Sequence, residues 1–434
     1  MFNTFRNAWK IEDLRKRILY TVMILVIFRL GIAVPVPFVD VTVMQALVNQ
    51  NSGDMLYFVD FMTGGAFSNG SLFALGVQPY INSTIIMQLL AVAIPALERM
   101  RKEGPEGERK FARLSRYVGA LLGAALGVGY YFLLRNQSGL MYAQGATLVD
   151  QLFTAFVIVL CFVAGSVLVM WMGEQIDQKG IGNGISLVIF VGIISRWSNI
   201  IDTMRGYGQA AQAGQPQIYI WLGVIVLLTA LAVVMVVVLN EAESRIKVQY
   251  GKKVVGRKMY GGQSSYIPIK VNMSGVMPII FASALTSIPA TILSLFSIPE
   301  ESFWFSLLKT MSSQGIGYAL VYGLLIVAFN FFYVAITYNP LEIANNLKKN
   351  NGAIPGIRPG KPSSDYISRI IRRVTLIGAI FLVLVAVVPI ILGNISQINI
   401  QMGGTSLLIV VGVALDTSRS LESFMLMRHH KGFM

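Results

Sequence analysis

Charged residues, cysteine and histidine are all scarce in this chain. Charged residues make up 13% of its 434 positions and hydrophobic residues 55%, whereas about a quarter of the residues of a soluble domain carry charge. A single cysteine, Cys161, excludes an intrachain disulfide scaffold, and the two histidines, His429 and His430, are too few for a Cys/His zinc cluster. Composition alone therefore predicts an integral membrane protein.

Catalytic signatures are missing as well. The chain has no Walker A, H-E-x-x-H or G-x-S-x-G pattern, and no predicted strand precedes the glycine-rich run 180–184, which we interpret as a flexible helix start. Every acidic residue lies in or beside a predicted loop, which disfavours an intramembrane protease or an ion-driven carrier. We expect no enzyme, no cofactor and no metal site.

Ten apolar stretches are each long enough to be considered for crossing a bilayer, which takes roughly 20 residues. They lie at about 18–38, 72–97, 117–134, 152–172, 181–197, 218–239, 275–297, 316–338, 374–393 and 405–427. The first follows basic residues, as in a signal peptide, but no clear cleavage site comes before Pro35. The sequence therefore predicts an all-α membrane protein with ten transmembrane helices.

Lysine and arginine are unevenly distributed between these spans. The segments 1–17, 98–116, 173–180, 240–274, 339–373 and 416–434 hold 30 of the 35 basic residues, and the alternate loops hold three. Loops rich in basic residues stay on the cytoplasmic side, so both termini are predicted to be cytoplasmic. This orienting role accounts for the net charge of +14 without nucleic acid, although basic loops could still contact ribosomal RNA.

Ten spans divide into two sets of five, which must cross the membrane in opposite directions. Inverted repeats of this kind place a transport pathway at their interface. The halves share no obvious motif, so the repeat is inferred from the count alone. The predicted divisions are a cytoplasmic N-terminus (1–17), an N-terminal half (18–197), an external connection (198–217), a C-terminal half (218–427) and a cytoplasmic tail (428–434).

Two cytoplasmic loops, 240–274 and 339–373, are each 35 residues long and hold seven basic residues each. The charge could serve only to orient the helices, or the loops could form a docking surface. The first loop places its central basic residues among strand and turn formers, which favours a projecting hairpin. In the second, glycine and proline surround Arg358 and favour a rigid tip.

Segment 54–71, between the first two spans, is apolar, too short to cross the bilayer, and rich in glycine toward its end. It suits a re-entrant segment that fills a cavity, and the alternative is a helix lying in the membrane interface. Two arginines lie within spans. Arg196 is expected to snorkel to the outer interface, and Arg29 is either a buried structural contact or an interior-facing group.

Aliphatic residues recur on one side of two spans. Val77, Ile81 and Ile85 are spaced four residues apart, and Ile185 and Ile189 repeat the interval. Such stripes in membrane helices usually face lipid or packing partners, so spacing alone does not indicate a pore.

Several long motifs occur in order along nearly the whole chain. They are Phe28–Gly31, Pro35–Pro37, Gly64–Ala66, Ala74–Ile81, Gly173–Gln175, Gly180–Ser186, Lys270–Pro278, Asn345–Lys349, Pro355–Gly360 and Gly403–Ile409. With these motifs the chain resembles the bacterial SecY family, whose members are channel subunits of the protein-conducting translocon.

The resemblance implies an hourglass of ten helices in two inverted five-helix halves, with a short re-entrant plug helix near 54–70. The implied pore ring at the waist is Ile81, Ile185, Ile189, Ile280 and Ile409, with Val77 adjoining. The implied plug residues are Phe61, Met62, Thr63, Gly64, Gly65, Ala66 and Phe67. An aliphatic constriction is costly to wet and resists ions, whereas its flexible side chains part around a polypeptide.

The resemblance also implies a lateral gate toward lipid, between the second and third helices on one side and the seventh and eighth on the other. Gln88 and Asn272 are its candidate polar residues, either hydrogen-bonded across the closed seam or packing singly. The basic loops correspond to the site for the SecA motor ATPase or a translating ribosome. The implied residues are Arg245, Lys252, Lys253, Arg257, Lys258, Lys348, Lys349 and Arg358.

The implied function is a channel that moves unfolded preproteins with signal peptides across the bacterial cytoplasmic membrane and releases membrane segments sideways into lipid. SecE and usually SecG are the expected partner subunits. The alternative is a secondary transporter with inverted five-helix repeats, against which the missing intramembrane carboxylates and the long basic loops both count.

Overall fold

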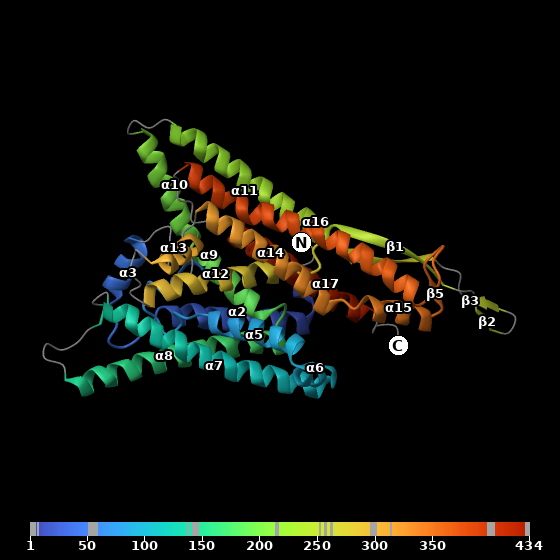
Figure 1. Cartoon of the computed structure of the whole chain (residues 1–434), viewed down its shortest axis with the longest axis horizontal. Helices are drawn as coiled ribbons and strands as arrows, with labels where there is room; N and C mark the ends of the chain where they lie inside the picture. Colours follow the sequence, from blue (N-terminus) through green and yellow to red (C-terminus); the bar gives the residue numbers. More distant parts are fainter. Residues whose placement is uncertain are drawn as a thin grey trace.

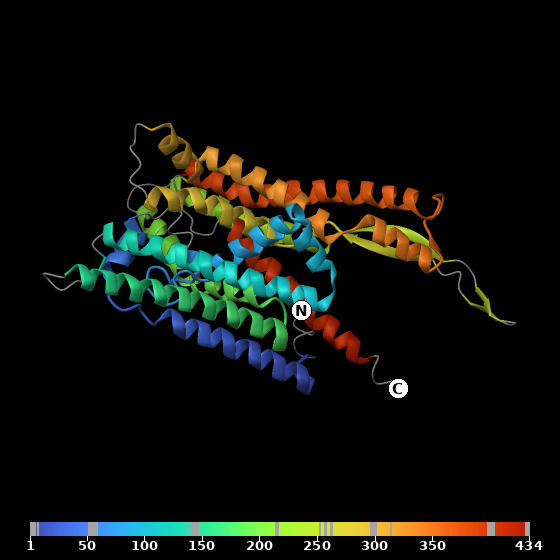
Figure 2. The same cartoon turned by 60° about the horizontal axis from the view of Figure 1, so that its bottom comes forward.

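Helices that run roughly along one axis form most of the molecule, and a small group of strands projects at one end (Figure 1). The computed structural model describes residues 6, 8–50, 60–136, 139–140, 147–212, 217–250, 253–255, 258–260, 264–295, 302–312, 315–396 and 404–429. Both views place the helices of the N-terminal half, blue to green, largely below those of the C-terminal half, yellow to orange (Figures 1 and 2).

The N-terminal half is built from helices whose ends follow local chemistry. Its helices are α2 (Glu12–Ile32), α3 (Val41–Gln50), α5 (Gln78–Ala93), α6 (Pro95–Lys102), α7 (Pro105–Asn136), α8 (Leu148–Lys179), α9 (Gly184–Ser195) and α10 (Trp197–Gln212). Thr147 and Asp150 form a capping box at the start of α8, and the Asn183 side chain caps α9.

One predicted span is bent. Helices α5 and α6 meet at an angle of 108°, because Pro95 lacks an amide hydrogen and forces Ile94 into an extended conformation. The stretch predicted at 72–97 is therefore helical only from Gln78 and turns away at its end.

The C-terminal half repeats the pattern of long apolar helices. Its helices are α11 (Gln217–Glu241), α12 (Met277–Leu295), α13 (Phe303–Ser312), α14 (Ile316–Thr337), α15 (Pro340–Lys349), α16 (Lys361–Ser396) and α17 (Gly404–His429). Helix α14 packs against both α12 and α16.

A multi-pass membrane protein is confirmed by length and hydropathy. Six helical stretches of the described chain are long and apolar enough to cross a bilayer, and the bent pair α5 and α6 would be a seventh. Each of the ten predicted stretches overlaps a helix. The count of ten spans stays a prediction, because α2, α12 and α17 do not meet the same test.

The two basic loops form one small strand structure. Strand β1 (Glu243–Tyr250) pairs antiparallel with β4 (Ser264–Lys270) and, on its other edge, with β5 (Gly352–Ala353) from the second loop. Beyond them, β2 (Lys253–Val255) pairs with β3 (Lys258–Tyr260). The projecting hairpin predicted for the first loop is confirmed.

The first described residues of the chain pack against α17 at one end of the bundle. Ala8 and Leu14 pack with Leu421 of α17 against Ile181, in the turn between α8 and α9. The Arg17 guanidinium also lies 5.3 Å from the centre of the Phe424 ring. Helix α17 reaches the strand end too, since the Arg419 side chain donates to the carbonyl of Asn240, three residues before β1.

Candidate channel site

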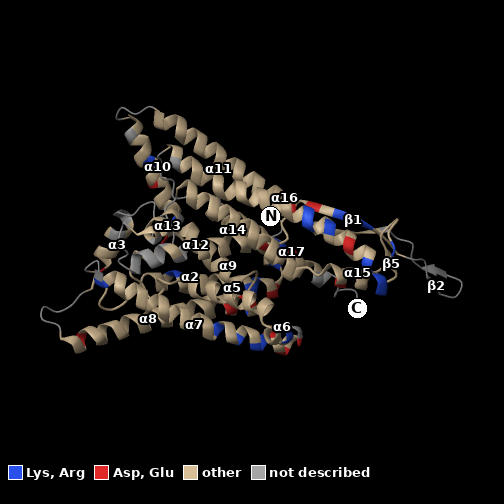
Figure 3. Ribbon diagram, in the orientation of Figure 1, with Lys and Arg blue, Asp and Glu red and all other residues tan. Residues whose placement is uncertain are grey.

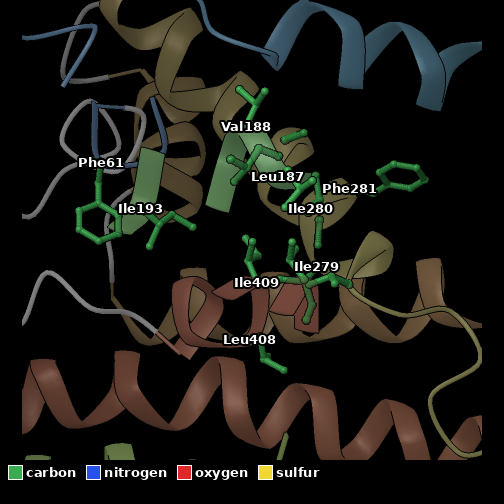
Figure 4. Close-up of a cluster of buried hydrophobic side chains, with 14 of the residues drawn as sticks. Phe61, Leu187, Val188, Ile193, Ile279, Ile280, Phe281, Leu408 and Ile409 are labelled. Carbon is green, nitrogen blue, oxygen red and sulfur yellow. The ribbon is translucent and has the colours of Figure 1, made fainter. Parts of the chain in front are cut away.

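A central cluster of apolar side chains joins the two halves (Figure 4). All six residues predicted for the pore ring belong to it or pack against it. Ile189 of α9, Ile280 of α12 and Ile409 of α17 are buried, with exposed fractions of 2%, 5% and 0%. Val77, Ile81 and Ile185 pack against the cluster and are partly exposed. The ring residues thus come from four helices that are far apart in sequence.

The cluster offers packing and exclusion of water but no chemistry. Apart from Met172, its buried members are aliphatic or aromatic, so the cluster is a close-packed apolar region. Among the described residues, no three His, Cys, Asp or Glu side chains gather where they could hold a metal ion.

The described part of the predicted plug, residues 60–71, is buried against this cluster. Phe61 is 2% exposed, belongs to the cluster, and points toward Ile193 of α9 (Figure 4). Phe67 is fully buried on the other side and meets the Tyr130 ring edge-on, with 4.8 Å between centroids. Burial of both faces favours the re-entrant interpretation over an interfacial helix. Residues 54–59 lie outside the described chain.

Gly64 of this segment and Gly192 of α9 bring the two backbones into contact. Gly64 and Gly65 have φ of 69° and 91°, in the left-handed region that side chains disfavour. A Cβ on Gly64 would lie 2.9 Å from the Cα of Gly192, and a Cβ on Gly192 would lie 2.6 Å from the carbonyl oxygen of Met62. Glycine at these positions therefore lets the segment and α9 touch without side chains between them.

The prediction that Arg196 snorkels to the outer interface is wrong. Its guanidinium points inward, pairs with the Asp60 carboxylate and donates to Ser68 Oγ at 2.8 Å. Asp60 is 1% exposed, so a carboxylate from a predicted loop is buried inside the protein, which the sequence did not indicate. The signal was missed because Asp60 stands in a predicted loop 136 positions from its partner.

Arg29 of α2 also contacts this segment. Its Nη1 donates to the carbonyl of Gly64 at 2.7 Å. The residue as a whole is exposed, so the contact is only partly buried, and an interior-facing role for Arg29 stays a prediction.

Comparison with known proteins gives this geometry a family. A sequence model described as SecY matches residues 71–418. The protein translocase subunit SecY of Thermotoga maritima is 40% identical over 440 residues, which cover 100% of this chain and 98% of that protein. The chain belongs to the SecY family. The SecY of Streptomyces coelicolor is also 40% identical, with 100% of both chains covered.

Solved structures agree in fold. A structure described as that of a protein conducting channel matches with a TM-score of 0.66 at 19% identity, covering 96% of this chain and 94% of the other. Sec61 in a canine ribosome-channel complex matches with a TM-score of 0.61 at 18% identity, covering 96% and 94%. This SecY-family chain therefore shares the fold of those channels over nearly its whole length.

The candidate gate residues of this SecY-family chain do not bond to each other among the described residues. Asn272 instead donates to Asn240 Oδ1 at 2.8 Å, and its own oxygen accepts from Ser274. Gln88 lies half-buried on α5, which together with α7 contacts α12. Of the two alternatives that the sequence left open for these residues, a hydrogen bond between them is not formed among the described residues, and their place at a lateral gate stays a prediction.

Sequence reasoning missed the polar cluster around Asn272. Ser274 hydrogen-bonds Asn330 of α14, whose amide donates to the carbonyl of Thr375 in α16 at 3.1 Å. Asn240, Asn272 and Ser274 line a cavity of about 440 Å³ that strand β4 also borders. In the sequence these residues are single polar positions in or beside apolar spans, and nothing in their spacing indicates that they contact one another.

The predicted docking residues lie at the strand end, where lysine and arginine gather (Figure 3). Arg245 of β1 is exposed, Lys348 and Lys349 end α15, and Arg358 is exposed before α16. Lys253 and Lys258 stand on β2 and β3. Lys252 and Arg257 lie outside the described residues. Two loops about 100 positions apart in sequence thus present their charges on one structure, since β5 pairs with β1.

Proposed function

We propose that this chain is the protein-conducting channel of a bacterial protein translocase. It passes unfolded preproteins across the cytoplasmic membrane through the central cluster and releases membrane segments sideways into lipid. One observation carries the proposal: six ring residues from four helices converge in one apolar cluster that Phe61 of the plug segment joins. The name of its relatives, protein translocase subunit SecY, which applies over the full chain, supports it.

The architecture that we propose is ten transmembrane helices in two inverted five-helix halves, divided at the connection 198–217. It is supported by the overlap of each predicted stretch with a helix and by the shared fold of a protein conducting channel. The segment at 60–71 is the plug, which closes the waist from the outer side. A related structure is described as showing that the plug domain of SecY stabilises the closed state.

The waist works by physical exclusion. When the channel is at rest, its aliphatic side chains leave no wetted path, so ions meet a barrier. During transport the same side chains rotate aside and pack around the passing chain whatever its sequence, because dispersion contacts have no directional requirement. A ring of polar side chains would hold water and leak ions in both states.

The chain supplies the pathway, and its partners supply energy. We propose that SecE and SecG complete the complex, and that the SecA ATPase or a translating ribosome docks on the basic strand end. Two related channels, Sec61 and Ssh1, are described in complexes with ribosomes. Exposed arginine and lysine suit a partner surface of RNA or acidic residues.

Both termini face the cytoplasm in this proposal. The packing of Ala8 and Leu421 at one turn supports a shared side, and the bond from Arg419 to Asn240 puts that side next to the basic strands. Short segments rich in lysine and arginine stay in the cytoplasm.

Transport of a radiolabelled secretory precursor tests the proposal. The full chain is reconstituted with SecE in proteoliposomes, SecA and ATP are added, and protection of the precursor from protease is measured. We expect protection that requires ATP, SecA and this chain. If the complex is intact, SecA is active on a control channel and no precursor is protected, the proposal is wrong and uptake of small solutes becomes the next test.

A further inference from the structure

The plug segment is held by charge as well as by apolar packing. Asp60, where the described part of the segment begins, forms an ion pair with Arg196 at the end of α9. Its other oxygen, Oδ1, accepts from the backbone amide of Ser68 at 2.7 Å, while Ser68 Oγ accepts from Arg196. The pair therefore closes a loop across residues 60–68 and ties that loop to a membrane helix.

The arginine lies flat against the plug backbone. A Cβ on Gly65 would lie 2.9 Å from Arg196 Nη2 and 3.1 Å from its central carbon, so glycine is what allows the guanidinium this position. The side chain of Arg196 is 18% exposed and that of Asp60 1%. Arg29 adds a second cationic contact to the carbonyl of Gly64 from α2.

The helix that holds the pair also carries the waist. Ile185 and Ile189 lie on α9, about three and two turns before Arg196 respectively, and Phe61, next to Asp60, packs in the same cluster as Ile189. A displacement of the plug thus breaks the ion pair, and a shift of α9 that widens the waist moves the partner of Asp60. Neither movement leaves the pair intact.

We propose that Asp60 and Arg196 form an electrostatic latch that holds the plug closed and couples its release to movement of α9. The inference rests on the proposed channel function and names a pair of residues that set how readily the resting channel opens. Two buried opposite charges stabilise the closed state only as a pair, because either one left alone in the protein interior is strongly unfavourable. Loss of one partner therefore favours the displaced plug, in which the remaining charge reaches water.

Leak through the resting channel tests the latch. The full chain with SecE is placed in planar bilayers without precursor, and the open probability is recorded for the parent, Asp60→Asn, Arg196→Gln and the double variant. We expect each single variant to raise the open probability about ten-fold, as expected when a buried charge loses its partner. The double variant, in which neither member of the pair is left without the other, is expected to leak less than either single variant.

Arg196→Lys is the conservative control. It keeps the positive charge without the planar guanidinium, so its leak is expected to lie between that of the parent and that of Arg196→Gln. If either single variant fails to assemble with SecE, the double variant alone tests the latch. Its open probability is then expected to exceed that of the parent several-fold.

Two results overturn the latch. One is a leak equal to that of the parent in the variants that assemble. The other is a double variant whose increase equals the product of the two single increases, because independent effects add in free energy. Precursor protection by the parent, measured in parallel, separates these failures from failure of the channel function: the latch can fail while the parent still transports.

Discussion

The central cluster and the basic strand end are built on opposite principles. The cluster unites Ile81, Ile189, Ile280 and Ile409 from both halves and has no exposed charge. The strand end is made from two loops, has its own small core around Val248 and Ile367, and carries exposed arginines such as Arg245 and Arg358. Sealing is thus a property of packing across the whole chain, whereas partner recognition depends on exposed charge in a short local structure.

The largest effect is expected from polar substitution at the waist. Ile280→Asn together with Ile409→Asn places amides where the cluster is fully apolar, so water and ions gain a wetted path. We expect the resting conductance in planar bilayers to rise by about 100-fold, while binding of SecA to the complex is unchanged.

The matched control is Ile280→Val with Ile409→Val, which keeps the waist aliphatic and is expected to leave the conductance within about two-fold of the parent. If the asparagine variant seals as well as the valine variant, the ring does not lie at the waist.

A backbone contact in the membrane region gives the next effect. Gly165 of α8 faces the carbonyl of Leu72, and a Cβ there would collide with that oxygen. We expect Gly165→Ala to reduce the free energy of unfolding by about 1–3 kcal/mol because the backbone must shift. Thermal unfolding of the purified complex measures the change.

Gly206 of α10 provides the control, since a Cβ there meets nothing within 4 Å. Gly206→Ala is expected to leave the stability unchanged or to raise it by about 0.5–1 kcal/mol, as alanine does in an exposed helix. Equal losses in the two variants would contradict the packing assigned to Gly165.

Charge reversal at the strand end is expected to have a smaller and different effect. Arg358→Glu should lower the rate of SecA-driven precursor transport by about ten-fold, because it replaces an attractive charge by a repulsive one at the docking surface. Assembly with SecE and resting conductance should be unchanged. Arg205→Glu, at an exposed arginine of α10, is the matched control and should transport normally. Normal transport by Arg358→Glu as well would remove that residue from the docking site.

The smallest effect is expected from a single surface ion pair near the same end. Glu12 lies 2.9 Å from Lys16 with both side chains about two-thirds exposed. We expect Glu12→Gln to change the free energy of unfolding by less than about 0.5 kcal/mol. A larger loss of stability, measured by thermal unfolding, would mean that exposed charges stabilise this end of the molecule directly. The contrast with the central cluster, which is stabilised by packing, would then be smaller.

Prediction from sequence succeeded where the signal is local or carried by a long motif. The hairpin followed from strand formers and turn residues around Lys253. The family motifs singled out six residues that gather in one apolar cluster, and their role as a pore ring stays a prediction. The bend at Pro95 was not predicted. Proline is a signal for the end of a helix, but the apolar run continues past it and was interpreted as one span.

The failures are contacts between distant residues. An arginine near a helix end fits snorkelling and an inward ion pair equally well, so nothing local connects Arg196 with Asp60. For the same reason the sequence did not indicate that Asn272 hydrogen-bonds Asn240. Hydrogen bonds of this kind depend on the three-dimensional path of the chain.

The central claim is that a polypeptide crosses through the apolar cluster, and crosslinking to a stalled precursor tests it most directly. A photoreactive residue is placed either at Ile409, which is fully buried, or at Leu324 of α14, which is 69% exposed on the outside of the bundle. The account predicts strong crosslinks from position 409 and few from position 324 when a precursor is arrested midway. Crosslinks from position 324 alone would contradict it.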